Sequence, residues 1–309
     1  MRLRIISPVV LSGALMLVCQ GSPLWAQAPA SEKPFPASDL FEKGWKYDQG
    51  LGTPSNMVKA LAWYQKAAEA GNPLAKARLA RIYFSGNGVE EDKAAGERYA
   101  KGIFPQILKA AENGDVVAEM IAGTMYADGL GVARDSAEAL KWLRKSADQN
   151  LAQAQVNLGV MYEHGIGVRT DFTEAARWYA KAAEQGHAMG QAALGDFYYQ
   201  GHGVPRNRYE AFRLYRLSAA QNNAHSLTNL GYMYEQGCTV CRNPWEAVRL
   251  YRLAADQGFA VAQANLGTMY EKGCGVCQDL NEAVNWYRRA AAQGNVHAIK
   301  ALQCLGYEP

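Results

Sequence analysis

Apolar residues recur along this chain at spacings of three and four, which is typical of amphipathic helices. Residues 151–186 contain two apolar stripes. The first consists of Ala154, Leu158, Met161 and Tyr162. The second consists of Ala175, Ala176, Trp178, Tyr179, Ala182 and Ala183. Gly165 and Gly167 stand between the stripes, and glycine accepts the positive φ at which helices end. The segment therefore predicts a helix–turn–helix unit.

This unit recurs with a period of 36 residues, measured between the glycines at the centre of its first helix, Gly123, Gly159, Gly195, Gly231 and Gly267. Each second helix opens on Asp or Asn with Glu three residues later. This spacing predicts a capping box in every copy, at Asp135/Glu138, Asp171/Glu174, Asn207/Glu210, Asn243/Glu246 and Asp279/Glu282. Self-similarity at such a period is the signature of a solenoid, in which each repeat buries its apolar face against its neighbours.

Two further copies precede these. Gly44 marks the first, and Ala80 takes the glycine position of the second, which is seven residues longer than the period. The extra residues lie near Ala100 to Gln106, where Gly102 and Pro105 predict a kinked or interrupted second helix. The division gives seven repeats and a C-terminal capping helix, at about 38–72, 73–114, 115–150, 151–186, 187–222, 223–258, 259–294 and 295–309.

The first residues are typical of an export signal. Arg2 and Arg4 precede an apolar run from Ile5 to Cys19, and the small residue Ala26 fits a cleavage site. The run is shorter than the ~20 residues that a membrane-spanning helix needs. We expect a signal peptide at 1–26, a disordered leader at 27–37, no membrane span, and a mature protein that is periplasmic or secreted. A lipid anchor at Cys19 and an uncleaved anchor remain alternatives.

Composition argues against several classes of function. The chain has 32 Lys and Arg against 29 Asp and Glu, without a basic block, so a nucleic-acid partner is not expected. The Gly-x-Gly pairs follow helices rather than strands and lack the Lys-Ser/Thr of a phosphate loop. The sequence also lacks the common catalytic motifs of metalloproteases, serine hydrolases and β-lactamases. We therefore predict no enzymatic activity, no cofactor and no metal.

Two Cys-x-x-Cys pairs distinguish two consecutive copies, Cys238/Cys241 and Cys274/Cys277, in the loop between the helices. In an exported protein such pairs favour disulfides, each contributing on the order of 2 kcal/mol as a local staple. A zinc site made by four thiolates, a redox role and pairing across the two loops remain alternatives. Thr239 replaces the second loop glycine of its copy. Cys304 is left over, and we expect it to be buried in the cap; a free thiol available for dimerisation is the alternative.

These repeats resemble the Sel1-like repeat family, a relative of the tetratricopeptide repeats, over nearly the whole mature chain. The family markers are Asn157-Leu158-Gly159-Val160-Met161-Tyr162, Gly165-Ile166-Gly167-Val168 and the run from Trp178 to Gly186. The resemblance implies an all-α, right-handed α/α solenoid that works as an adaptor. It also implies places for such proteins in envelope regulation or host interaction, and some cysteine-rich relatives have been called β-lactamase-like.

The same resemblance predicts which side chains meet a partner, because first helices line the concave face of tetratricopeptide-like solenoids. Residues one and four positions after the central glycine then face the groove, and the candidates among them are Trp45, Arg81, Glu163, Asp196, Tyr199, Tyr232, Glu235 and Glu271. Second helices are expected to turn arginines outward, at Arg213, Arg216, Arg249, Arg252, Arg288 and Arg289. The alternative is that the tyrosines pack between repeats and the acids are simply solvated.

Together these observations predict a monomeric, exported scaffold that binds a protein or peptide of some basic character through its concave face. The alternative from another class is an enzyme active on cell-wall material, similar to β-lactamases. A zinc-stabilised scaffold is a third possibility.

Overall fold

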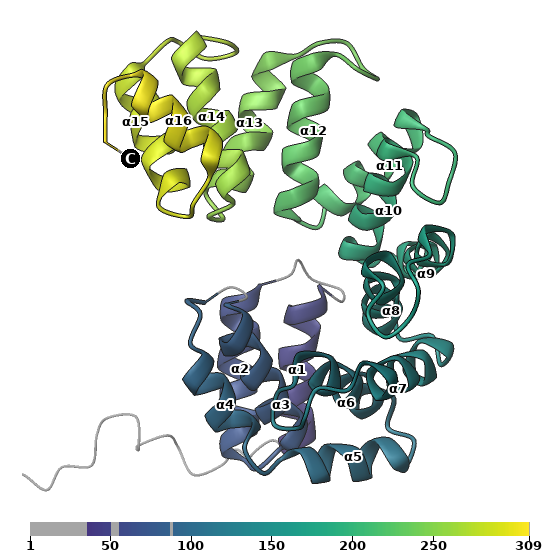
Figure 1. Ribbon diagram of the computed structural model, residues 1–309. Coiled ribbons are helices and arrows are strands. Elements are labelled where there is room, and N and C mark those ends of the chain that lie inside the picture. The colour runs from purple at the N-terminus through teal and green to yellow at the C-terminus, as the bar shows by residue number, and fades with distance from the viewer. Residues whose placement is uncertain (1–35, 51–55, 87–88, 309) are drawn as a thin grey trace, which may run out of the picture. The chain divides into compact units, whose positions relative to one another are not determined.

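The computed structural model describes residues 36–50, 56–86 and 89–308, and the structural statements below concern these ranges. They contain sixteen α-helices and no strand (Figure 1). The predicted signal peptide and nearly all of the predicted leader lie outside the described residues, while Ala37 already belongs to the first helix. No helix of the described ranges combines the length and the apolar character that crossing a membrane requires.

First and second helices alternate along the chain. The first helices are α1 (Ala37–Gln49), α3 (Pro73–Ser85), α6 (Val116–Asp128), α8 (Ala152–His164), α10 (Ala188–Gln200), α12 (Ala224–Gln236) and α14 (Ala260–Lys272). The second helices are α2 (Met57–Glu69), the pair α4 (Lys93–Ala100) and α5 (Phe104–Glu112), α7 (Ser136–Asp148), α9 (Phe172–Glu184), α11 (Arg208–Ala219), α13 (Pro244–Ala255) and α15 (Leu280–Ala291). The last helix is α16 (Val296–Cys304).

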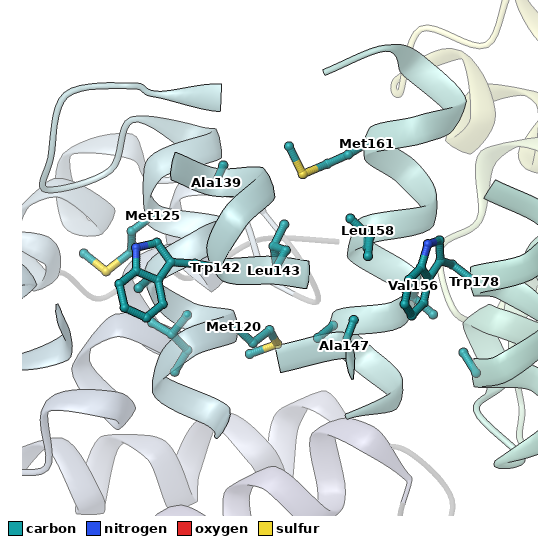
Figure 2. Close-up of a cluster of buried hydrophobic side chains, with 14 of the residues drawn as sticks. Met120, Met125, Ala139, Trp142, Leu143, Ala147, Val156, Leu158, Met161 and Trp178 are labelled. Atoms are coloured by element: carbon teal, nitrogen blue, oxygen red, sulfur yellow. The ribbon is translucent and has the colours of Figure 1, made fainter. Parts of the chain in front are cut away.

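Each first helix packs against the second helix of its own repeat, and each second helix packs against the first helix of the next repeat. Buried side chains therefore pass from repeat to repeat without a break. Figure 2 shows Met120, Leu143, Leu158 and Trp178, one from each of α6 to α9, within one such cluster. This packing of each helix on the helices next to it in the chain is the arrangement of a helical solenoid, as the 36-residue period predicted.

The interruption predicted in the second copy is confirmed. Its second helix is divided into α4 and α5, with Lys101–Ile103 between them. Gly102 adopts a φ of 71°, and Pro105 stands in the first turn of α5, where a missing N–H costs nothing. Ile107 of α5 is fully buried, so the added turns extend the core beside α6.

In five repeats the central glycine is explained by a tyrosine twenty residues later, and in the third repeat Leu143 takes that place beside Gly123. A Cβ added at Gly159 would lie 2.5 Å from the Tyr179 ring, and one at Gly231 would lie 2.7 Å from the Tyr251 ring. Contacts this short require the neighbour to move. The second copy, which has Ala80 at the glycine position, has Ala100 where the others have a large side chain.

The predicted capping boxes are only half correct. Asp135 caps α7 as expected, since its carboxylate accepts from the backbone N–H of Glu138 at 3.0 Å. Glu138 does not return a bond to Asp135, whose N–H donates instead to the carbonyl oxygen of Tyr126 at 3.0 Å. The Glu138 carboxylate accepts from the indole N–H of Trp142 at 3.0 Å. The equivalent bond forms in the next repeat, where the Asp171 N–H donates to the carbonyl oxygen of Tyr162.

Candidate protein-binding surface

Buried tyrosines of the second helices hold three of the predicted partner-binding carboxylates. Their hydroxyls donate to one glutamate each, Tyr179 to Glu163 at 2.6 Å, Tyr251 to Glu235 at 2.8 Å and Tyr287 to Glu271 at 2.6 Å. Burial, and next the glutamate, raise the pKa of each phenol well above its ordinary value, so the hydroxyl stays a proton donor. Each glutamate is half-buried and fixed in direction by a rigid ring.

The fifth repeat reaches the same result with a different residue. Tyr199 stands where the neighbouring repeats have glutamate. The Tyr215 hydroxyl donates instead to Asp196, which lies three residues before Tyr199, at 2.7 Å. The Asp196 carboxylate also contacts the His225 ring nitrogen Nε2 at 2.8 Å and accepts from the Asn229 amide at 3.2 Å. The hydrogen bond to Asp196 raises the pKa of His225. We call Glu163, Asp196, Glu235 and Glu271 the carboxylate row.

The first repeats differ from the carboxylate row in electrostatics. Asp48 accepts from the Tyr64 hydroxyl at 2.8 Å, but it also forms a buried ion pair with Arg78. The Arg78 guanidinium lies 5.4 Å from the ring centre of Trp45. Arg81 pairs with Asp128 at 3.2 Å. The structure thus places the predicted residues Trp45 and Arg81 in an N-terminal network whose acids are already neutralised.

The carboxylate row has no such basic partner. Within the described ranges, Glu163, Glu235 and Glu271 form no ion pair with any Lys, Arg or His, and Asp196 pairs only with His225. Some arginines of the second helices pair with acids of their own helix instead, as Arg249 does with Glu246. The row is therefore a line of four carboxylates, one in each of four consecutive repeats, without a strong counter-charge.

Aromatic side chains accompany the row on α10 and α12. Tyr232 is 43% exposed, and Tyr199 is half-buried. Burial, and then the charge interaction with Tyr232, raise the pKa of Tyr199. The guanidinium of Arg208 lies 5.7 Å from the Tyr199 ring centre. Asp196 and Tyr199 thus stand on α10, and Tyr232 stands on α12, the first helix of the next repeat.

The partners of these acids, namely the buried tyrosines, His225 and Asn229, were not predicted from the sequence. A pattern in the sequence points to the tyrosines, because an acid four residues after the central position is accompanied by a tyrosine sixteen residues further on. The third repeat lacks both, having Ala127 and Leu143 at those two positions. Such paired loss is what a direct contact predicts.

The cysteines of the loops are free thiols in the described structure. Cys238 and Cys274 are half-buried, whereas Cys241 and Cys277 are exposed. Disulfides within each loop remain a prediction. No group of three or more His, Cys, Asp or Glu side chains within the described ranges is placed to hold a metal ion. The expectation for Cys304 is wrong, because it is exposed, and Leu302 supplies the buried side chain of α16.

A cavity of about 1020 Å³ is lined by residues of the first three repeats, such as Arg78, and by residues of later repeats, such as Asn157 and His187. Its lining includes three acids, Asp48, Glu91 and Asp128, and three bases, Arg78, Arg81 and Lys93. Equal numbers of opposite charges give it no preference for an anion or a cation. The carboxylate row is therefore the surface with the clearer chemical character.

Comparison with known proteins assigns the chain to a family. A Sel1 repeat model matches seven segments, at residues 44–72, 73–101, 116–151, 152–187, 188–223, 224–259 and 260–295. Proteins built from these repeats generally serve as scaffolds for protein–protein interaction rather than as enzymes. A search of curated proteins gives no match.

Two solved structures resemble the chain closely enough to compare. One is a protective antigen present in uropathogenic Escherichia coli strains, with 35% identity over 87% of this chain and a TM-score of 0.59. This chain spans only 56% of that antigen. The other is a Sel1 repeat protein from Oxalobacter formigenes, with 29% identity, 87% of this chain and 76% of that one covered, and a TM-score of 0.60. With seven matched repeats, the chain belongs to the Sel1 repeat family.

Proposed function

We propose that this chain is an exported scaffold that binds a basic segment of a partner protein along the carboxylate row. One observation carries the proposal. All four carboxylates accept a hydrogen bond from a buried tyrosine hydroxyl, yet no lysine or arginine of the described ranges neutralises them. A fold that needed these charges only for itself would pair them, as Asp48 is paired with Arg78.

The arrangement lowers the cost of binding a cation. A lysine or arginine of a partner can form a charge-assisted hydrogen bond with each carboxylate oxygen that the tyrosine leaves open. Because the tyrosine already fixes the carboxylate, little further side-chain entropy is lost on binding. Equivalent positions in consecutive repeats present the acids at regular intervals. An extended or helical segment with regularly spaced basic residues fits such a row.

The exposed aromatic residues supply the apolar part of the surface. Tyr232 and Tyr199 stand on the same two first helices as Asp196 and Glu235. Tyrosines in a partly desolvated setting are frequent energetic anchors of protein interfaces. We therefore place the centre of binding on α10 and α12, with the acids of α8 and α14 extending it at either end.

Export is part of the proposal and rests on the N-terminal sequence, with its basic start and short apolar run. The likeness to a protective antigen of uropathogenic Escherichia coli supports a place in the envelope or at the host interface. Because this chain spans 56% of that protein, only a shared type of surface is carried over.

In-cell crosslinking of the exported protein, followed by mass spectrometry, tests this function. The comparison variant combines Asp196→Lys with Tyr232→Ala, and Glu184→Lys is the matched control, because Glu184 is an exposed acid at the end of a second helix. A partner that is captured by the wild type and the control but lost from the variant supports the proposal. A partner retained by all three moves the site elsewhere, and the absence of any partner refutes the scaffold role.

A further inference from the structure

Two second helices expose large apolar side chains that the core does not use. On α11, Tyr209 is 75% exposed and Leu217 is 42% exposed. On α13, Trp245 is 72% exposed and Leu253 is 40% exposed. The two pairs are 36 residues apart and therefore occupy equivalent positions in consecutive repeats. The buried faces of these helices are formed by other residues, such as Leu214 and Leu250.

The repeat fold does not require apolar residues at these positions. The equivalents on the neighbouring second helices are small or polar, with Thr173 and Lys181 on α9, Asn281 and Arg289 on α15, and Ala137 and Lys145 on α7. A residue needed for packing would recur in every copy, as the buried tyrosines nearly do. The apolar pairs are thus a local feature of two repeats.

Arginines complete each surface. Along α11 the exposed residues Tyr209, Arg213, Arg216 and Leu217 are spaced by four, three and one, and Trp245, Arg249, Arg252 and Leu253 repeat that order along α13. At about 100° per residue, each set falls within roughly a quarter of the helix circumference. We call these two sets the outer stripes.

The outer stripes carry a net positive charge. Arg213 pairs with Glu210 at 2.5 Å, and Arg249 pairs with Glu246 at 2.6 Å. Arg216 and Arg252 form no ion pair with an acid of the described ranges. The Arg216 guanidinium lies 5.9 Å from the Phe212 ring centre, and the Arg252 guanidinium donates a hydrogen bond to the Tyr270 hydroxyl. Each unpaired arginine also precedes an exposed leucine directly.

We propose that the outer stripes of α11 and α13 form a second docking surface, for a protein segment with both apolar and acidic side chains. Tryptophan, tyrosine and arginine are the residue types that contribute most to protein interfaces. Arg216 and Arg252, which have no carboxylate partner in the described ranges, select an acidic partner by charge complementarity. This partner is opposite in charge to the one proposed for the carboxylate row, so the inference goes beyond the proposed function and gives the scaffold two separate binding surfaces.

Site-specific photo-crosslinking tests the inference. The photoreactive residue p-benzoylphenylalanine replaces Leu253 in the full chain, made in its native cell, and the adducted peptides are sequenced. We expect adducts to a protein segment rich in Asp, Glu and apolar residues. Their yield should fall roughly ten-fold with Arg216→Glu and Arg252→Glu together, and similarly with Tyr209→Ala and Trp245→Ala together.

Matched variants separate this surface from general charge effects and from the carboxylate row. Lys181→Glu with Arg289→Glu makes the same charge change on α9 and α15 and should leave the adducts intact. Asp196→Lys with Tyr232→Ala should also leave them intact, even if the proposed function fails. Adducts only to a second copy of the chain, to lipid or to a basic segment, or no adduct from a protein with wild-type circular dichroism, would overturn the inference.

Discussion

Replacing Tyr251 with phenylalanine tests the link between a buried tyrosine and the carboxylate row. The change removes one hydroxyl and keeps the ring that packs on Gly231. The lost bond runs to the Glu235 carboxylate at 2.8 Å, and bonds to charged groups contribute about 1.5–3 kcal/mol. Glu235 is half-buried and regains part of this from water. We therefore expect the free energy of unfolding to fall by about 1 kcal/mol.

A double-mutant cycle isolates the bond itself. Urea unfolding is followed by circular dichroism for the wild type, Tyr251→Phe, Glu235→Ala and the double variant, with a repeat-based fit because solenoids need not unfold in two states. The coupling free energy should be about 1 kcal/mol. Tyr215→Phe is the comparison, and it should cost less, because Asp196 keeps its contacts with His225 and Asn229.

A coupling free energy below about 0.3 kcal/mol, within the additivity of independent sites, would refute the reasoning. The Tyr251 hydroxyl would then not hold the carboxylate, and the row would not be pre-positioned for a partner. If the coupling is present, Tyr251→Phe should weaken partner capture less than Glu235→Gln does, because phenylalanine leaves the charge in place.

Three further outcomes follow from the geometry. The buried tyrosines Tyr64, Tyr179, Tyr215, Tyr251 and Tyr287 should remain un-ionised above pH 10, where free tyrosine ionises. Because their pKa values are raised in the folded state, stability should fall as pH rises, and phenolate absorbance should appear together with unfolding. Gly159→Ala should lower the free energy of unfolding by roughly 1–3 kcal/mol in the wild type. In a chain that already carries Tyr179→Ala, the same change should cause no further loss, and denaturant titration measures both effects. The raised pKa of His225 stabilises the fold below about pH 6.5, and this contribution is lost as pH rises through the folded value; Asp196→Asn should remove that pH dependence, and an unchanged dependence would contradict the assignment.

The fold was predictable because its determinants are local and repeated. Glycine and Asx positions recur at one period, and the helices of each repeat pack mainly on those of adjacent repeats, so one correctly interpreted copy describes most of the others. The interruption between α4 and α5 was also predictable, since Gly102 and Pro105 act on their own backbone. The glutamate half of the capping box was not, because the competing acceptor is the carbonyl oxygen of Tyr126, on the preceding helix.

The candidate site was predictable only in outline. Counting from the central glycine identified the acids, but their partners lie on another helix, sixteen to nineteen residues away for the tyrosines and 29 for the pair of Asp196 with His225. The neutralisation of Asp48 by Arg78, thirty residues apart, depends on how consecutive repeats stack. Cys304 was misplaced because a nine-residue terminal helix has only one buried face.

Departures from the repeat fall into two kinds, and the difference separates structure from function. Some are compensated within the fold. In the third repeat, Ala127 and Leu143 stand where other repeats have the acid and the tyrosine that bonds to it, so neither group is left alone. In the fifth repeat, Tyr199 occupies the position of the acid, and Asp196 accepts from Tyr215 in its place. The apolar residues of the outer stripes are not compensated, since Tyr209 and Trp245 remain about three-quarters exposed. Exposed aromatic surface adds nothing to the fold and raises the risk of aggregation. A compensated departure needs no partner to explain it, whereas an uncompensated one directs the search for a partner to the outer faces of α11 and α13.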